Sequence, residues 1–526
     1  MENKKMKIIS IASIIALALT LVTATYAFFV AQTGEGAQTD IKINANTVDT
    51  FTFEAGSALN LSLNQENFAS GKGNQTGTTF AKAMLTANNK TNTATEHYYL
   101  YLNISNNTFT YSIDNNTPEI LLSIKDGSNN EITSVSGLTY KTVTDGKGAS
   151  IKGFDITTKS GLITILNNRE ITTTSTKTEQ WNVTVTFVNY NANQAGNAGK
   201  RFSAKLMIQQ EKILTVLSDV CTSGNNLATC ITTLSNKSEP SIVNIYHHDS
   251  SLANGARDNS YRYAGANPNN FVCFGTTESP CPTDNLYRII GVINDKVKLI
   301  KYDYMTTDEL GTDGDYSQTY KEWGMDSTYK GTYGDGERIG VYFWNNDAGT
   351  NTWSTSLLNK TNLNTNFINY LGTTWANKIA SVTWKVGGNT WANIGTKTSS
   401  VAYTNEITNP VTTNTTDNAT TYSAKIGLMY VSDYGFAASP DAWTLTMSSY
   451  NNTTATNNNW MYMGLYEWTI SRSADDSDIA FSVYNDGYVN DGSVNIDFGV
   501  RASFNLESSV SYVSGSGSMS DPIVIN

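Results

Sequence analysis

The chain has 526 residues, of which 39% are hydrophobic and 15% charged, and its formal net charge is −11. This length exceeds the roughly 250–300 residues at which a single hydrophobic core stops growing, so we expect more than one domain. The acidic balance would repel a phosphate backbone over most of the surface, which argues against nucleic acid as a partner.

The composition favours strands over long helices. The chain holds 29 Tyr and 10 Trp but only 8 Pro, and Asn, Thr, Ser and Gly are visibly abundant. Aromatic and β-branched residues fit the pleated surface of a sheet, and Asn, Ser and Gly fit the turns between strands. We therefore expect a mainly β protein.

The first segment has the pattern of an export signal. Residues 1–7 are basic, and residues 8–30 form an uncharged, largely apolar run. The small residues Thr25 and Ala27 have the spacing that signal peptidase requires, so we expect residues 1–27 to be a signal peptide cleaved after Ala27. Because the run is also long enough to span a bilayer, an uncleaved hydrophobic helix that anchors the protein in the membrane is the alternative. Both readings predict a secreted or cell-surface protein.

Residues 28–211 show alternating apolar and polar runs bounded by turn residues. Trp181, Val183, Val185 and Phe187 share one face of their run, which predicts that they point into a core. This pattern is typical of a β-sandwich of the jelly-roll kind. The runs that we expect to be strands are "TFTFEAG", "HYYLYLNIS", "TFTYSID", "EILLSIKDG", "QWNVTVTFVNY" and "RFSAKLMIQQ".

Three stretches of this half carry a resemblance. The junction "TYAFF", the stretch "ALNLSL" and the run "QWNVTVTFVNYNANQAGNAGKRFSAKLMI" resemble the TasA/camelysin family of exported biofilm-matrix fibre proteins of Gram-positive bacteria. The resemblance implies self-association into fibres or with other surface proteins. The freed segment from Phe28 onward could add as a strand to a neighbouring subunit. Some members of that family are labelled metalloproteases, but this chain has three histidines, His97, His247 and His248, and no HExxH motif.

Residues 212–239 predict a helical linker between the halves. Apolar residues recur there at helical spacing, which indicates two short helices, and we expect a Cys221–Cys230 disulfide to join them. The second pair, Cys273 and Cys281, encloses a loop that contains Gly275 and Pro280, so a second disulfide is expected. A Cys₄ zinc site and two pairs of free thiols are the alternatives.

Residues 240–526 begin with a predicted hairpin that turns at Asn294 and Asp295. A helical stretch follows, with apolar residues at four- or five-residue steps from Leu358 to Ile379 and Ser356 as a possible cap. Strands are then expected at "AKIGLMYVSDYGF", "YEWTISRS", "IAFSVYNDGYV" and "FGVRASFNL", with turns at the two Asn-Asp-Gly triplets between residues 484 and 493.

The segments "YEWTISRS" and "GVRASFNL" resemble bacterial domains of the formylglycine-generating and C-type-lectin-like fold. The resemblance implies an α+β domain in which Glu467, Trp468 and Arg501 are structural markers of the fold. A charge buried alone would cost several kcal/mol, so we expect Arg501 to pair with Glu467 or to cap backbone carbonyls. Because no cysteine follows Cys281, the thiol chemistry of the enzymatic branch is excluded.

Other catalytic patterns are weak, so we expect no enzymatic activity. Asp475, Asp476 and Asp478 could act as paired carboxylates of a carbohydrate hydrolase, which is the alternative function, but such a cluster is ordinarily a solvated turn. No metal site or cofactor is expected. The stretches "GTDGDYS" and "YFWNNDAG" contain oxygen donors that could hold calcium, although neither fits a regular calcium loop.

These patterns favour a non-catalytic surface or matrix protein, structural and adhesive, with an outer domain that binds glycans or proteins. Aromatic residues stack on sugar rings and give large contact areas with few rotatable bonds, although they could equally fill the core of their own loop. The candidate binding aromatics are Tyr316, Tyr320, Trp323, Tyr329 and Tyr333.

Overall fold

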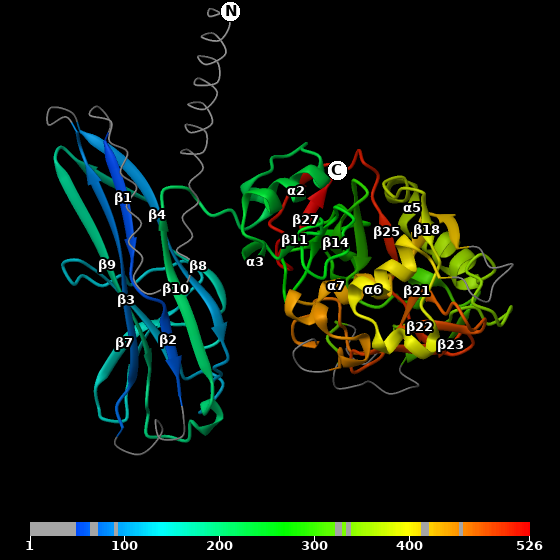
Figure 1. Ribbon diagram of the computed structural model, residues 1–526, viewed down its shortest axis with the longest axis horizontal. Coiled ribbons are helices and arrows are strands. Elements are labelled where there is room, and N and C mark those ends of the chain that lie inside the picture. The colour runs from blue at the N-terminus through cyan, green and yellow to red at the C-terminus, as the bar shows by residue number, and fades with distance from the viewer. Residues whose placement is uncertain are drawn as a thin grey trace, which may run out of the picture. The chain divides into compact units, whose positions relative to one another are not determined.

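The structure is a computed structural model, and it describes residues 49–63, 72–88, 93–320, 329–332, 338–411, 420–451 and 456–526. The expected signal segment 1–27, the proposed strand after Phe28, and the candidate residues Trp323 and Tyr333 lie outside these residues. Among the helices of the described residues, none is long and apolar enough to cross a membrane. The chain divides into two compact units, Met1–Ile213 (unit 1) and Leu214–Asn526 (unit 2). In Figure 1 the described part of unit 1 begins with the blue strands, and unit 2 ends with the red strands.

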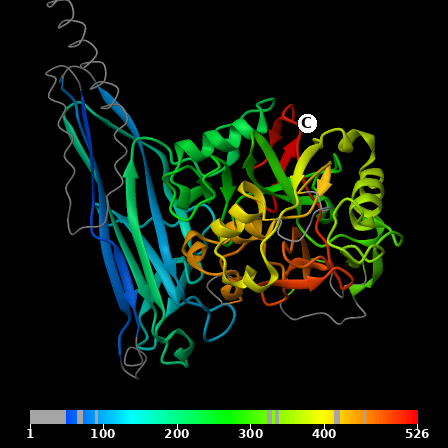
Figure 2. The same ribbon diagram turned by 45° about the vertical axis from the view of Figure 1, so that its right-hand side comes forward.

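Unit 1 consists of antiparallel strands in two sheets (Figures 1 and 2). The first sheet has the order β1-β3-β9-β5-β7-β6 and the second β2-β10-β4-β8. Their bounds are β1 Thr50–Ala55, β2 Leu59–Ser62, β3 Gln75–Thr86, β4 Ala94–Asn107, β5 Ile120–Asp126, β6 Tyr140–Thr144, β7 Ser150–Asp155, β8 Gly161–Thr173, β9 Thr176–Phe187 and β10 Arg201–Gln209.

One cluster of buried apolar residues lies between these sheets and draws on both of them. Trp181, Val183, Val185 and Phe187 of β9 all belong to it, so the predicted core face is confirmed. Alternation works here because successive side chains of a strand point to opposite faces. Leu102 of β4, in the second sheet, is buried in the same cluster.

The strand expected over "TFTYSID" is absent, which corrects the prediction for residues 108–114. The backbone N–H and the hydroxyl of Ser112 both donate to the carboxylate of Glu119 at 2.6 Å. Asp114 accepts from the backbone N–H groups of Asn116 and Thr117. Such local side-chain bonds offer the backbone an alternative to a ladder, so the alternating pattern does not become a strand.

Unit 2 contains a larger mixed sheet, β20-β25-β15-β14-β13-β27-β26, in which β12 also pairs with β14 and β11 pairs with β12. A second sheet has the order β16-β17-β24-β21-β22-β23, and β18 and β19 form a separate pair. The bounds are β11 Ile245–His247, β12 Tyr261–Tyr263, β13 Phe271–Cys273, β14 Leu286–Ile293, β15 Lys296–Lys301, β16 Tyr316–Thr319, β17 Gly340–Phe343, β18 Val382–Lys385, β19 Thr421–Ala424, β20 Ile426–Gly427, β21 Glu467–Arg472, β22 Ile479–Val483, β23 Val489–Ser493, β24 Asp497–Gly499, β25 Ser503–Asn505, β26 Tyr512–Ser514 and β27 Ile523–Ile525.

The helices of unit 2 are short. The α-helices are α2 Leu227–Lys237, α3 Pro240–Val243, α4 Thr307–Leu310, α5 Ile368–Ala376, α6 Ser399–Tyr403 and α7 Val431–Ala437. Several 3₁₀ and π-helical turns join them, of which Leu217–Asp219 and Leu358–Phe367 bear on the sequence analysis.

The segment expected to be a linker packs inside unit 2. Leu227, Ile231 and Leu234 of α2 are buried in the same cluster as Val272 of β13. Of the two helices expected there, α2 is an α-helix and the other is the 3₁₀ turn Leu217–Asp219. Because this stretch contributes to the core, it belongs to the second unit from Leu214 onward.

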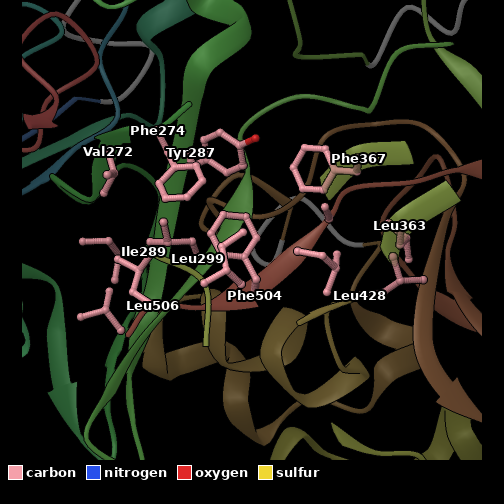
Figure 3. Packing of buried hydrophobic residues seen from close by; sticks show 14 of the residues in the cluster. Val272, Phe274, Tyr287, Ile289, Leu299, Leu363, Phe367, Leu428, Phe504 and Leu506 are labelled. Atoms are coloured by element: carbon pink, nitrogen blue, oxygen red, sulfur yellow. The ribbon is translucent and has the colours of Figure 1, made fainter. Parts of the chain in front are cut away.

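The hairpin at residues 286–301 is confirmed. Strands β14 and β15 pair antiparallel, and Asn294 and Asp295 between them have φ of 49° and 60°. Two successive positive φ values define the tight turn that suits a right-twisted hairpin. Figure 3 shows Tyr287 and Ile289 of β14 and Leu299 of β15 gathered with Phe274 and Phe504 in the core beside this hairpin.

Of two further stretches of unit 2, one agrees with the sequence analysis and one differs from it. The five-residue step from Leu358 to Leu363 matches a π-helical segment, Leu358–Phe367, which continues as α5, and Ser356 Oγ accepts from the backbone N–H of Asn359 as expected of a cap. Of the strand expected at "AKIGLMYVSDYGF", only short pieces are present, at the end of β19 and in β20, and the last six residues of the stretch belong to the helix α7. Its carboxylate Asp433 accepts from the backbone N–H of Tyr430 before the helix start, a bond that favours a helix over a strand.

Candidate ligand-binding cavity

A cavity of about 300 Å³ opens in unit 2 where several chain segments meet. The loop before β13, the strand β14 and the residue after the end of β15 form one wall, and residues 457–463 form another. Its lining residues are Ala266, Asn267, Pro268, Asn269, Phe271, Arg288, Tyr302, Lys330, Asn457, Asn459, Trp460, Tyr462, Met463, Ser518 and Met519.

Arg288 is the buried cation of this cavity. It lies in β14, where every residue but the last is buried, and it is 5% exposed. Its Nε donates to Oδ1 of Asn270 at 2.7 Å, and its Nη2 donates to the carbonyl of Pro268 at 3.1 Å. A longer bond of 3.4 Å joins Nη1 to the carbonyl of Trp460. These neutral acceptors fix the plane of the guanidinium without neutralising its charge.

Aromatic rings cover the guanidinium. The Cζ atom of Arg288 lies 4.2 Å from the ring centre of Phe271 and 4.7 Å from that of Trp460. Burial is the main cause that lowers the pKa of Arg288 to about 9; Tyr302 opposes this shift, and the neighbouring charge of Arg501 adds to it. No carboxylate among the described residues forms an ion pair with Arg288, so the site has an uncompensated positive charge.

Lys330 is the second cation and lies at the exposed edge of the cavity. Its Nζ is 4.4 Å from the ring centre of Tyr462 and donates to the carbonyl of Thr456 at 3.2 Å. Partial burial lowers the pKa of Lys330. A cation over a ring and beside a carbonyl still has N–H donors for a ligand, because the ammonium group has three.

The buried carboxylate of Asp303 holds the segment that carries Lys330. Tyr329 donates its hydroxyl to Oδ1 of Asp303 at 2.6 Å, and the backbone N–H of Thr332 donates to Oδ2 at 2.6 Å. The backbone N–H of Lys330 itself donates to the carbonyl of Met463 at 2.9 Å. Lys330 therefore has anchored neighbours on both sides, which fixes where its backbone meets the cavity.

The rest of the lining includes aromatic, amide and small or apolar side chains. Phe271 and Tyr302 pack edge to face, with ring centres 5.3 Å apart. Trp460 donates its indole N–H to the carbonyl of Tyr263 at 2.8 Å, so its orientation is fixed. The lining residues of the described chain include no Asp, Glu, His or Cys. The arrangement can hold a ligand by stacking and by charge.

The three fold markers lie together in unit 2. Arg501 donates from Nε and Nη2 to the two carboxylate oxygens of Glu467 at 2.7 and 2.8 Å, and also to the carbonyl of Met461 at 2.7 Å. Trp468 is fully buried and donates its indole N–H to the carbonyl of Tyr342 at 2.9 Å. These contacts give the three residues a structural role, and Met461 connects the ion pair to the cavity wall at Trp460.

The described candidate aromatics each contact neighbouring residues of unit 2. Tyr320 is 3% exposed, in a cluster with Tyr304. The ring of Tyr316 packs against Tyr342 at 5.6 Å, and Tyr329 is bound to Asp303. None of these three lines the cavity, although Tyr329 positions Lys330. Trp323 and Tyr333 lie outside the described residues.

Both predicted disulfides are present. The Cα atoms are 5.7 Å apart in Cys221–Cys230 and 5.9 Å apart in Cys273–Cys281, and no described cysteine is free. Disulfides form and persist in oxidising compartments, so the pair indicates an extracellular or similarly oxidising environment.

The other candidate carboxylates are engaged locally. A side-chain hydrogen bond with the carboxylate of Asp476 raises the pKa of Asp478, and both residues lie in the segment before β22. In "GTDGDYS", Asp313 accepts from Asn366, and Asp315 accepts from the backbone N–H of Leu358. No group of three or more His, Cys, Asp or Glu side chains in the described residues has the geometry for a metal ion.

The sequence analysis missed Arg288 and Trp460. The sequence did point to Arg288, because "LYRIIGVI" places one arginine in an otherwise apolar strand. A charge buried in such a strand needs a compensating partner. The aromatic run after the Asn-rich stretch at 456–459 was a weaker signal. Comparison with protein-family models, curated proteins and solved structures found no match to this chain.

Proposed function

We propose that this chain is an exported, cell-surface or extracellular-matrix protein of a Gram-positive-type bacterium, structural and adhesive, in which unit 2 binds a glycan or protein ligand without catalysis. The observation that carries the proposal is the cavity beside Arg288: it combines ring faces and two cations with no acidic residue in its described lining. Pockets with this composition bind through ring faces and a few oriented polar groups. Both disulfides suit an exported protein.

The architecture proposed for each unit follows the two resemblances. Unit 1 would be a jelly-roll-like sandwich of the TasA/camelysin kind, which the two sheets around one buried cluster support. Unit 2 would be a C-type-lectin-like domain of the formylglycine-generating fold, with the pair Glu467–Arg501 as its internal brace. Its larger sheet is mixed, since β13 and β27 run parallel.

Unit 1 is the part that we propose to self-associate. Strands β1 and β6 stand at the two ends of the first sheet's order, and an edge strand presents unpaired backbone groups to an added strand. The segment 28–48 of a neighbouring copy would supply that strand and build a head-to-tail fibre. A chain without residues 28–48 should no longer form filaments in electron microscopy, and filaments from that chain would refute this assembly. If residues 1–27 are not cleaved, they would also anchor the protein in the membrane.

A glycan array, combined with a reducing-sugar assay on the bound glycans, tests the binding function of the full chain. Binding without release of reducing ends supports the proposal. Release of reducing ends would favour instead a hydrolase that uses paired carboxylates such as Asp476 and Asp478. If no glycan binds, a protein would be the remaining class of ligand. Binding of the chain to immobilised surface proteins would then test it.

A further inference from the structure

We propose that the cavity of unit 2 binds a sugar residue that bears a carboxylate, as an acidic monosaccharide or as one unit of an acidic glycan, with Arg288 and Lys330 as the groups that recognise the carboxylate. The inference rests on the proposed binding function of unit 2 and adds the chemical class of the ligand.

The charge of Arg288 has no counter-charge within the described residues. Of the five N–H donors of a guanidinium, three are used by Asn270, Pro268 and Trp460, which leaves two for a ligand. Elsewhere in unit 2, most buried cations lie against carboxylates, such as Arg501 against Glu467 and Lys301 against Glu309. Arg472 is the exception and donates to the backbone carbonyls of Val386 and Ser473. Arg288 has no such partner among the described residues, although the chain as a whole has a net charge of −11. A ligand carboxylate would supply the missing partner at low cost in reorganisation, because the guanidinium is already fixed.

Lys330 places a second positive charge on the same cavity. The held segment 329–332 brings its backbone to the rim, and its Nζ lies over Tyr462. The buried guanidinium of Arg288 and the ammonium group of Lys330 at the rim together suit a ligand whose anionic group enters the cavity first. An exposed ammonium also attracts anions from solution, so binding should weaken as salt is added.

The rings argue that the anion is part of a larger organic molecule. Phe271, Tyr302 and Trp460 surround the cavity, and the apolar face of a sugar ring packs well on such surfaces. Asn267, Asn269 and Asn457 on the exposed side offer carboxamides that can bond with sugar hydroxyls. A bare phosphate or acetate would meet the two cations but leave these surfaces unused.

Volume sets the size of the ligand. The cavity of about 300 Å³ lies at the lower end of the ~300–1,000 Å³ typical of small-molecule pockets. One sugar residue would fill it, whereas a longer chain would have to continue into solvent past Lys330 or the exposed Met519. The site therefore fits a terminal or single acidic residue.

The test is a calorimetric titration of the full chain with glucuronic acid, N-acetylneuraminic acid, glucose, acetate and inorganic phosphate. We expect at least one acidic sugar to bind roughly tenfold or more tightly than glucose, acetate and phosphate, because only it uses both the cations and the rings. Lys330→Met should weaken that binding by roughly tenfold, since it removes a charge while keeping an apolar stem. Lys360→Met is the matched control, because Lys360 is an exposed lysine of unit 2 that does not line the cavity, and it should change nothing.

Arg288→Lys keeps the positive charge but loses the fork, and it should weaken binding more than Lys330→Met does. An unchanged melting temperature shows that a variant keeps its fold. If Arg288→Lys does not fold, the affinity of Lys330→Met still tests the inference. Equal affinity for glucose would overturn the inference and leave the proposed function standing. Equal affinity for acetate or phosphate, or no effect of Lys330→Met, would also overturn it. If no acidic sugar binds while the glycan array shows other ligands, only this inference fails; if neither shows binding to any glycan, the glycan function fails as well.

Discussion

Arg501 and Glu467 form a two-point ion pair inside unit 2, with Nε–Oε1 at 2.7 Å and Nη2–Oε2 at 2.8 Å, and neither side chain is more than 2% exposed. The third bond of Arg501, to the carbonyl of Met461, links this pair to the residue that follows the cavity wall at Trp460. The pair therefore braces the second sheet of unit 2 against the segment that shapes the cavity.

Breaking this pair should be costly. Glu467→Gln removes one charge at nearly constant shape and leaves Arg501 buried without a counter-charge, so we expect the free energy of unfolding to fall by about 3–5 kcal/mol. Denaturant unfolding followed by tryptophan fluorescence measures this, because Trp181 is the one tryptophan of the sequence that falls in unit 1. The control is Asp284→Asn, which breaks a partly exposed pair with Arg338 and should cost less than about 1 kcal/mol. An equally small loss for Glu467→Gln would contradict this role.

Glu406 should make unit 2 less stable as the pH rises. Its buried carboxylate accepts from Ser471 Oγ and from the backbone N–H of Ser432, and burial raises its pKa to about 7 from an ordinary value of 4.5. Between these two values the folded state holds a proton that the unfolded state has released. Stability therefore decreases with rising pH across this window, by about 3 kcal/mol in total.

The variant Glu406→Gln should lose this contribution. His248, whose pKa burial lowers to about 3, acts in the opposite sense, because its stabilising contribution is lost as the pH falls below 6.5. The relevant quantity is therefore the difference between Glu406→Gln and the parent chain, measured by unfolding at pH 5, 6, 7 and 8. A difference that does not change with pH would show that Glu406 does not titrate in this range.

Gly517 should be intolerant of a side chain. It has φ of 90°, its carbonyl accepts from the backbone N–H of Phe271 at 2.8 Å, and an added Cβ would lie 2.3 Å from the carbonyl oxygen of Asn269 in the cavity wall. Gly517→Ala should lower the melting temperature and weaken ligand binding. Gly224→Ala is the control: Gly224 has φ of 93° but no atom within 4 Å of the added Cβ, so it should cost only the backbone strain of about 1–2 kcal/mol. Equal effects of the two substitutions would contradict the close approach at the cavity.

The two disulfides should be complete in the protein isolated from its natural source. Alkylation under denaturing, non-reducing conditions should label none of the four cysteines, and mass spectrometry should find the peptides of Cys221 and Cys230 joined, and likewise those of Cys273 and Cys281. The double variant Cys273→Ala/Cys281→Ala should lower the free energy of unfolding by about 2–4 kcal/mol. Labelled cysteines would argue against the oxidising compartment.

The sequence predicted the structure best where a local pattern is compatible with only one local structure. The alternation from Trp181 to Phe187 predicted a core-facing strand, and two turn residues at Asn294 and Asp295 predicted a hairpin. The expectation that Arg501 pairs with Glu467 or caps backbone carbonyls followed from the cost of burying either charge alone, and Arg501 makes both contacts. Each of these needed only local pattern or a single energetic rule.

It failed where the outcome depends on distant partners. Residues 108–114 alternate like a strand, but the backbone N–H of Thr110 donates to the side chain of Asn197, far along the chain. The helix α7 carries Asp433, whose carboxylate pairs with Lys298 of β15 and Arg262 of β12. The cavity itself joins residues 266–271, 288, 302, 330, 457–463 and 518–519, so no single stretch of sequence could reveal it.

The most direct test of the central claim, that unit 2 recognises an acidic sugar and does not cleave it, is one proton NMR time course of the full chain with an oligosaccharide that ends in glucuronic acid. The account predicts saturation transfer from protein to the terminal acidic residue, reduced in Lys330→Met, with no new reducing-end anomeric signals over a day. New anomeric signals that grow with time would contradict it, as would saturation transfer confined to the neutral residues.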